Sequence, residues 1–117
     1  MADAVIQFQI LSTVPDETAE FYSTLFGWSV NNDNPMGYRE IRTGATEGIH
    51  GGIWPAPPQA TNFVQLFMAV DDVEKSAKRA EELGAKMLIP PTSLPDGSEM
   101  AVLHDPQGMS FGIVRRV

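Results

Sequence analysis

The sequence contains no cysteine among its 117 residues. Disulfide bonds, thiol nucleophiles and thiolate metal ligands are therefore excluded. Basic residues are scarce as well, because 8 Lys and Arg side chains stand against 15 Asp and Glu side chains, which gives a formal net charge of −7. An acidic chain is a poor partner for nucleic acid or for an anionic membrane, so we expect neither as a partner.

Long apolar runs are missing too. No stretch approaches the roughly 20 residues that are needed to cross a bilayer. The N-terminal segment MADAVIQFQI lacks the basic region and the apolar core of a secretory signal, so the expected location is the cytoplasm. Hydrophobic residues make up 43% of the chain, which is enough for the core of one compact domain.

The first half of the chain has the pattern of a strand, a helix and three further strands. Residues 5–11 alternate between apolar and polar side chains, as a half-buried strand does. Pro15 and the acidic residues after it favour a helix start, and Gly27 favours its end. Three β-prone segments with turn residues between them follow, up to Trp54.

The second half repeats this order. Residues 62–70 read as a strand, residues 71–84 as a helix that ends at Gly84, and three further strands follow. We therefore predict a single domain over 1–117. It consists of a first βαβββ module at about 4–54, a linker at about 55–61 and a second module at about 62–117.

The repeat is also in register. Gln65 follows Gln7 by 58 residues, and each lies in the middle of the first strand of its module. The segment FGIV at 111–114 follows GGIW at 51–54 by 60 residues. Such similar offsets indicate one duplicated unit with small changes in loop length.

A βαβββ unit covers one face of its sheet with a helix and leaves the other face uncovered, so two units are expected to pair. The predicted fold class is α+β, with two paired βαβββ modules forming a cupped mixed sheet. Side chains on a strand alternate between its two faces. In the first strand, Ile6, Phe8 and Ile10 should pack on the helix, and Gln7 and Gln9 should face the cup.

The same alternation assigns the other strands. In the strand over 62–70 we expect Val64, Leu66 and Met68 to pack inward, while Phe63, Gln65 and Phe67 line the cup. The helices should bury the apolar residues that lie three or four positions apart. These are Phe21, Tyr22, Leu25 and Phe26 in the first helix, and Val73, Ala77, Ala80 and Leu83 in the second.

Eight residues are candidates for a ligand pocket in the cup, on chemical grounds. Buried glutamines need hydrogen-bond partners, which are either each other, water or a ligand. The aromatic residues either line a pocket or form ordinary core. His50 is either a substitute metal ligand or a proton shuttle near neutral pH, or it is a strand-end residue with no role. The candidates are Gln7, Gln9, Tyr38, His50, Trp54, Phe63, Gln65 and Phe67; no catalytic residue is identified.

Three segments, taken together, resemble one superfamily. DETAEFYSTLFGW at 16–28, FMAVDDVEKSAKRAEELGAK at 67–86 and HDPQGMSFGIV at 104–114 are similar to motifs of the vicinal oxygen chelate superfamily. This superfamily includes glyoxalase I, bleomycin-resistance proteins, fosfomycin-resistance proteins and extradiol dioxygenases. The resemblance covers nearly the whole chain, and it implies a homodimer.

The resemblance also implies where a metal centre would lie. Metal-using members place ligands on strands one, four, five and eight, and the corresponding residues here are Gln7, Gly52, Gln65 and Gly112. Glycine has no side chain, and amide oxygens are poor ligands for Zn, Ni or Fe. The strand-eight carboxylate that serves as base in the glyoxalase I reaction is also missing. We therefore expect no metal-binding residue and no cofactor, with a divalent metal kept as the alternative.

Three functions are compatible with these residues. The favoured one is a glyoxalase/bleomycin-resistance-like protein that binds a small organic molecule in the cup without the usual metal. The second is a metal-dependent lyase or dioxygenase of the same superfamily, whose ligands lie outside the register used above. The third is a structural protein with a vestigial pocket. Whether the chain is an enzyme stays open; an enzyme would have glyoxalase-like lyase or dioxygenase-like activity.

Overall fold

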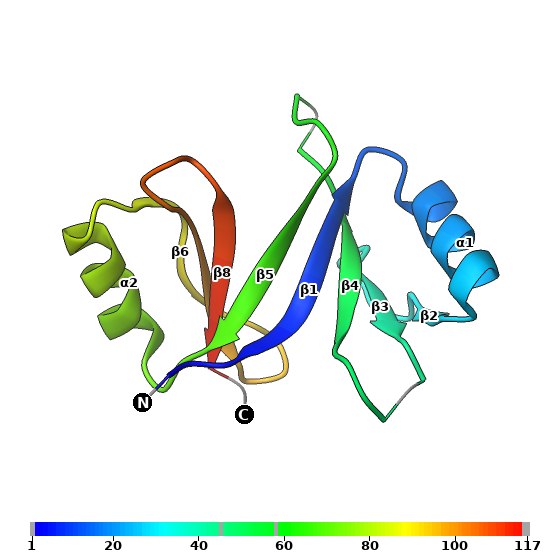
Figure 1. Ribbon diagram of the computed structural model, residues 1–117, viewed down its shortest axis with the longest axis horizontal. Helices are drawn as coiled ribbons and strands as arrows, with labels where there is room; N and C mark the ends of the chain where they lie inside the picture. The colour runs from blue at the N-terminus through cyan, green and yellow to red at the C-terminus, as the bar shows by residue number, and fades with distance from the viewer. Residues whose placement is uncertain (1, 45, 58, 116–117) are drawn as a thin grey trace. The chain divides into compact units, whose positions relative to one another are not determined.

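The computed structural model describes residues 2–44, 46–57 and 59–115, and these contain two helices and eight strands in the predicted order (Figure 1). The elements are β1 (Val5–Ser12), α1 (Pro15–Phe26), β2 (Ser29–Asn31), β3 (Arg39–Arg42), β4 (His50–Pro55), β5 (Phe63–Ala69), α2 (Val73–Glu82), β6 (Lys86–Ser93), β7 (Glu99–His104) and β8 (Ser110–Arg115). None of these helices is both long enough and apolar enough to cross a membrane.

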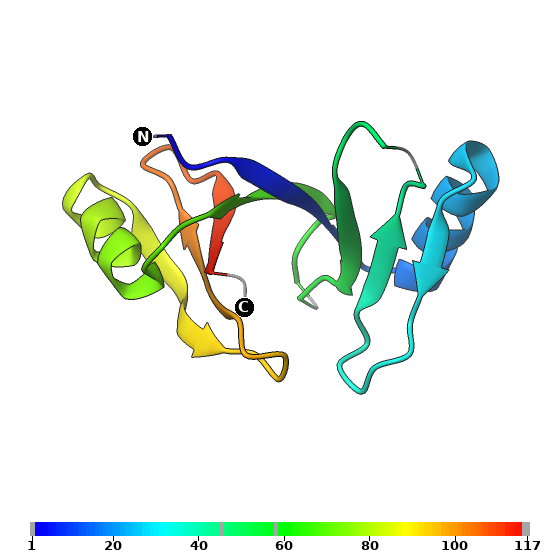
Figure 2. The ribbon, with the colours of Figure 1, turned by 90° about the horizontal axis from the view of Figure 1, so that it is seen from below.

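The chain divides into two compact units. The first unit is Gln7–Gln65, and the second unit joins the residues up to Ile6 to those from Leu66 onward. Strand order is β2-β3-β4-β1 in the first and β5-β8-β7-β6 in the second. In both units the first strand pairs in parallel with the last, and the remaining pairs are antiparallel (Figure 2). The fold is therefore α+β with a mixed sheet and two βαβββ repeats, as predicted.

The strand register confirms the duplication residue by residue. In the first unit Gln9 lies opposite Gly52, and in the second unit Phe67 lies opposite Gly112. Phe67 follows Gln9 by 58 residues and Gly112 follows Gly52 by 60, which are the offsets read from the sequence. The two units thus place equivalent residues at equivalent points of their sheets.

The core of the first unit lies between α1 and its sheet. Ala19, Ile41 and Ile53 are buried there, and Phe8 and Ile10 pack against them. This confirms the predicted helix-facing side of β1 for Phe8 and Ile10. Their alternate neighbours on β1 must therefore face away from α1.

The predicted packing face of α1 is wrong. Phe21, Leu25 and Phe26 are 58%, 59% and 56% exposed, and the helix turns Ala19 towards the sheet instead. A small residue at the contact lets a helix approach a sheet closely, whereas a row of large rings would hold it off. Tyr22 contacts the rest of the first unit through its ring, which stacks on the ring of Trp28 with centroids 5.4 Å apart.

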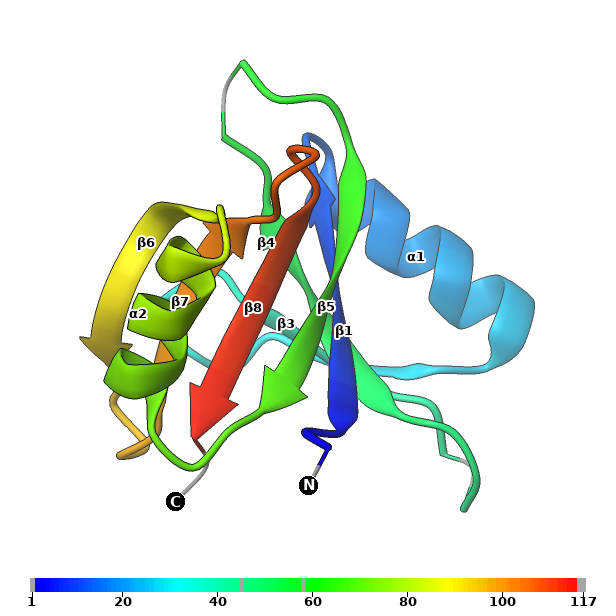
Figure 3. The same ribbon diagram turned by 60° about the vertical axis from the view of Figure 1, so that its left-hand side comes forward.

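In the second unit, α2 lies across β6, β7 and β8 (Figure 3). The Asp72 carboxylate caps the helix by accepting a hydrogen bond from the backbone N–H of Lys75 at 3.0 Å. Val73 and Ala77 are fully buried under the helix, as predicted. The prediction that Leu83 belongs to the same buried stripe is wrong, because Leu83 follows the last turn of α2 and is 63% exposed.

Three predictions of strand facing are also wrong. Ile6 packs against the cluster of Phe67, Val102 and Val114 rather than beside Phe8 and Ile10. Val64 and Leu66 are 61% and 47% exposed instead of packed inward. Alternation predicts which residues share a face, but it does not predict how much of that face is covered.

Candidate functional site

The face of the first unit's sheet that points away from α1 carries a compact group of polar and aromatic residues. Because Ile53 faces α1, its neighbours Gly52 and Trp54 on β4 face the opposite way. Gln9 lies directly opposite Gly52 on β1 and shares this face. Tyr38, the residue before β3, places its ring against Gly52. We call Gln9, Tyr38, Gly52 and Trp54 the first-unit cluster.

Tyr38 is held in place at both its backbone and its ring. The Asn34 side chain donates a hydrogen bond to the Tyr38 carbonyl at 2.6 Å and accepts one from the Tyr38 N–H at 3.2 Å. The Tyr38 and Trp54 rings have centroids 4.5 Å apart and are tilted by 35°. The turn before β3 therefore fixes an aromatic pair on the sheet.

Gly52 is required by this arrangement. A Cβ at position 52 would lie well under 3.0 Å from the hydroxyl and ring carbons of Tyr38, closer than real Cβ contacts come. Any side chain at this position would have to displace Tyr38. The resemblance places a metal-binding carboxylate at Gly52, and in this chain the phenol ring occupies that space.

The second unit repeats the arrangement with a different ring. A Cβ at Gly112 would lie well under 3.0 Å from the ring carbons of Phe67. Phe67 is 3% exposed and packs with Val102 and Val114 on the face away from the α2 core. Both positions that lack a carboxylate are thus covered by aromatic rings from the same unit.

The residues present do not fit the metal centre that the resemblance implies. Glycine contributes no donor at two of the four positions, and aromatic carbon fills the space beside each glycine. Gln7 and Gln65 supply only neutral amides at the other two. Within the described ranges, no three His, Cys, Asp or Glu side chains gather where they would hold a metal ion.

The Gln9 side chain links the polar part of the cluster. It is 4% exposed, and its amide hydrogen-bonds the Tyr38 hydroxyl. Its carbonyl oxygen Oε1 is buried and has no hydrogen-bond partner in the described part of the protein. Burial raises the pKa of Tyr38 to about 12; the Gln9 hydrogen bond opposes this rise in part, and the nearby Glu40 carboxylate adds to it. Tyr38 is therefore a neutral phenol at physiological pH.

The raised pKa of Tyr38 predicts that its phenol loses its proton at a higher pH than an ordinary tyrosine does. Replacing Tyr22 with Phe keeps its ring stacking and leaves Tyr38 as the sole tyrosine of the two in the chain. Phenolate absorbance of Tyr22→Phe should then rise with a midpoint near 12 in the folded protein. Since this pKa lies above the unfolded value, the stability due to neutral Tyr38 should be complete below about pH 10 and fall as the pH rises towards 12. A midpoint near 10 in the folded protein would contradict the burial of Tyr38.

Two of the other predicted pocket residues, Gln7 and His50, share the face of this cluster, because they lie two positions from Gln9 on β1 and from Gly52 on β4. His50 and Gln7 are register partners on β4 and β1, and exposed His50 accepts a hydrogen bond at Nδ1 from the Thr43 N–H at 3.0 Å, as a strand-end residue does. Phe63 is half-buried at the start of β5, and Gln65 is buried near the end of the first unit. Phe67 belongs to the second unit. Of the eight candidates, Tyr38 interacts with both Gln9 and Trp54, and Gln7 and His50 are the next pair along the same face.

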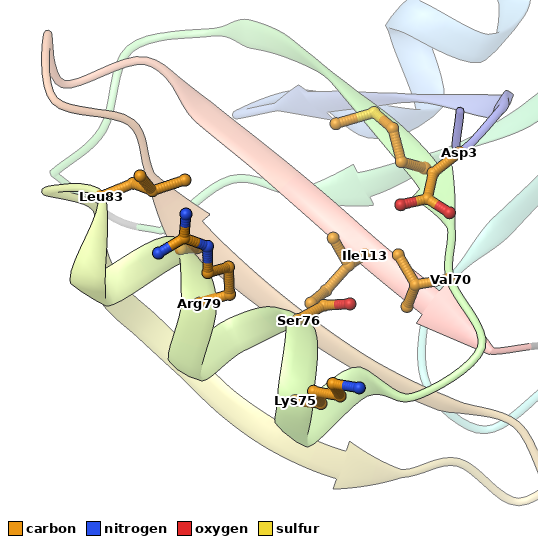
Figure 4. Close-up of a pocket in the computed structure, with 9 residues that line it drawn as sticks. Asp3, Val70, Lys75, Ser76, Arg79, Leu83 and Ile113 are labelled. Carbon is orange, nitrogen blue, oxygen red and sulfur yellow. The ribbon is translucent and has the colours of Figure 1, made fainter. Parts of the chain in front are cut away.

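A separate groove of about 420 Å³ runs along α2 in the second unit (Figure 4). Met68, Val70 and Ile113 contribute apolar surface, and the lining also includes Lys75 and Arg79. None of the eight predicted pocket residues lines this groove. Asp3, Lys75 and Ser76 also line the groove, but Asp3 and Lys75 are exposed to solvent. The first-unit cluster, with its buried Gln9, is therefore the better candidate site.

Comparison with known proteins finds relatives along almost the whole chain. The family described as "Glyoxalase-like domain" matches residues 6–114. A Mycobacterium tuberculosis protein that is named as a glyoxylase, CFP32, is 29% identical in a 110-position alignment that covers 92% of this chain and 42% of that protein. The anthracycline biosynthesis protein DnrV of Streptomyces peucetius is 25% identical in a 115-position alignment that covers 85% of this chain and 42% of that protein. The chain thus spans less than half the length of these curated relatives.

Solved structures share the fold at lower identity. A methylmalonyl-CoA epimerase in complex with methylmalonyl-CoA aligns with a TM-score of 0.68 and 18% identity, covering 100% of this chain and 96% of that one. Protein BH1468 from Bacillus halodurans aligns with a TM-score of 0.71 and 14% identity, with the same coverage. These likenesses show the fold type and no more than that.

Proposed function

The chain belongs to the glyoxalase-like domain family of the vicinal oxygen chelate superfamily, and from that premise we propose that it binds a small organic molecule without the usual metal centre. The ligand would lie against Trp54 and Tyr38 of the first-unit cluster. This proposal covers binding; it assigns no reaction to the chain.

One observation carries the proposal. The space beside Gly52, where the resemblance puts a metal-binding carboxylate, is filled by Tyr38, and the space beside Gly112 is filled by Phe67. A chain that had only lost its carboxylates would leave gaps at these positions. Rings held by neighbouring turns and strands instead give a surface suited to an apolar or aromatic partner.

The relatives support a small-molecule ligand in general terms. The name of DnrV associates that protein with anthracycline biosynthesis, and the epimerase structure contains methylmalonyl-CoA. Both concern organic molecules of modest size, but they differ from each other in chemistry. The homodimer implied by the resemblance and the cytoplasmic location stay predictions alongside the ligand.

The proposal is tested by combining metal analysis with ligand-dependent stability. We expect purified protein to hold no stoichiometric Zn, Ni, Fe or Mn and to gain no stability from added divalent ions. Some aromatic compound should raise the melting temperature, since a ligand at 100 times its Kd adds about 2.7 kcal/mol to the stability. Trp54→Ala should abolish that rise, whereas Trp28→Phe, on the α1 side of the sheet, should keep it.

Each alternative has its own result. Stoichiometric metal in the purified protein would favour the metal-dependent lyase or dioxygenase. Failure of every compound in a broad aromatic library to raise the melting temperature would favour a structural protein with a vestigial pocket. A rise that persists in Trp54→Ala would move the ligand away from the first-unit cluster.

A further inference from the structure

We infer that the ligand of the first-unit cluster is an uncharged, planar molecule that donates a hydrogen bond to Gln9 Oε1. This inference rests on the proposed function and adds the chemical class of the ligand. It makes Gln9 a specificity-determining residue, because its carbonyl oxygen selects molecules that carry an N–H or O–H group.

The need for a donor follows from the state of the Gln9 amide. The side chain is 4% exposed and interacts with the Tyr38 hydroxyl. Its oxygen is buried and has no partner among the described residues. Buried acceptors in folded proteins are nearly always satisfied, and an orphan acceptor destabilises the fold. The site is therefore short of one donor, which a ligand can supply.

The planar shape follows from the neighbours of this oxygen. Gln9 faces away from α1, because Phe8 and Ile10 on either side of it pack on the α1 side. The rings of Tyr38 and Trp54 lie on the same face and contact each other. Two half-buried rings beside a single acceptor suit a flat molecule that stacks on the rings and turns its donor towards the amide.

The absence of charge follows from the surrounding ionic groups. Arg39 and Arg42 are the sole Lys or Arg residues between positions 7 and 65. Arg39 pairs with Asp16 at 2.7 Å and Arg42 with Glu40 at 3.2 Å, so both cations are engaged. An anionic ligand would have to displace Asp16 or Glu40 from its arginine to gain a cation there, and the Gln9 oxygen would repel it. A cationic ligand would meet a neutral amide, and Glu40, on the same face, already has Arg42 as its partner.

The test uses two probes that differ in one hydrogen-bond donor. Indole is planar, uncharged and carries an N–H, whereas 1-methylindole has the same ring system without the donor. Binding of each probe is followed by titration in two-dimensional ¹H–¹⁵N NMR spectra, which also report the Gln9 side-chain amide. Indole should bind to the wild-type protein at least about tenfold more tightly than 1-methylindole, since only indole satisfies the buried oxygen.

Two variants separate recognition from stability. Gln9→Met keeps the length of the side chain and removes the acceptor, so the two probes should then bind within about twofold of each other. Gln107→Met makes the same change at an exposed turn and should keep the wild-type ratio. Equal binding of both probes to the wild type, an unchanged ratio in Gln9→Met, or no saturable binding of indole would each overturn the inference. A water molecule on Gln9 Oε1 would give the first of these results.

The proposed function can survive these failures. It depends on the metal analysis and on the Trp54→Ala result with whichever compound stabilises the protein. A compound that stabilises the wild type but not Trp54→Ala, combined with equal binding of indole and 1-methylindole, would retain the function and reject the role of Gln9.

Discussion

Gly112→Ala is expected to lower the free energy of unfolding by about 3 kcal/mol, the upper part of the usual range for overpacked cores. The added Cβ would overlap the ring of Phe67, which is 3% exposed and enclosed by Val102 and Val114. Because the ring is almost fully buried, relieving the overlap requires its neighbours to move with it. Urea denaturation followed by circular dichroism measures the change.

A double-mutant cycle shows whether the ring is the cause. Phe67→Ala alone should cost about 3–5 kcal/mol, because it leaves a cavity in the core. In the double variant, the new methyl group at position 112 occupies part of that cavity. The cost of the double variant should therefore be smaller than the sum of the two single costs by at least about 1 kcal/mol. Additive costs would show that the Cβ at position 112 clashes with something other than Phe67.

Much of the fold was accessible from the sequence, because it depends on local signals. The order of the elements follows from turn residues and from apolar periodicity. The duplication follows from the similar offsets between equivalent residues of the two halves, such as Gln7 and Gln65. The structure pairs Gln9 with Gly52 and Phe67 with Gly112, and these two pairs are related by the same offsets. These signals are written into neighbouring residues and do not require knowledge of which elements come into contact.

The errors arose where contact between elements decides the outcome. The first helix has more apolar residues than its contact with the sheet can bury, so periodicity could not show that Ala19 faces inward and Phe21 faces solvent. Leu66 is likewise 47% exposed although alternation assigns it to the inward face. Such features follow from three-dimensional packing, which one sequence does not specify by pattern alone.

The candidate site was predicted in part for the same reason. Gln9, Tyr38 and Trp54 were identified by residue type, and the missing carboxylates were identified by their place in the strands. The function of the two glycines was not. A glycine inside a strand indicates close approach by another group, and this signal would have pointed to Gly52 and Gly112 as contact points for rings. It would not have said that Tyr38 and Phe67 supply the rings.

Restoring a carboxylate by Gly52→Glu is expected to destabilise the first unit by about 3 kcal/mol and to create no metal site. The new side chain would compete with Tyr38 for one volume, and it would bring a second carboxylate onto the face that carries Glu40. Thermal unfolding with and without MnCl₂ or ZnCl₂, together with elemental analysis, measures both effects. Gly52→Ala separates the steric cost from the effect of the charge, and it should account for most of the loss.

Removing the ring should reverse the steric part of this loss. In the double variant Tyr38→Ala/Gly52→Glu, the carboxylate can occupy the space that the phenol ring leaves. The double variant should therefore be more stable than the sum of the two single costs predicts. Metal affinity should still be absent, because Gln7 and Gln65 supply neutral amides and Gly112 supplies nothing. Stoichiometric metal in Gly52→Glu, with Tyr38 still present, would contradict the interpretation that the Tyr38 ring occupies the place of a metal-binding carboxylate. Stoichiometric metal in the double variant alone would instead show that Tyr38 is the main obstacle to a metal centre in this fold.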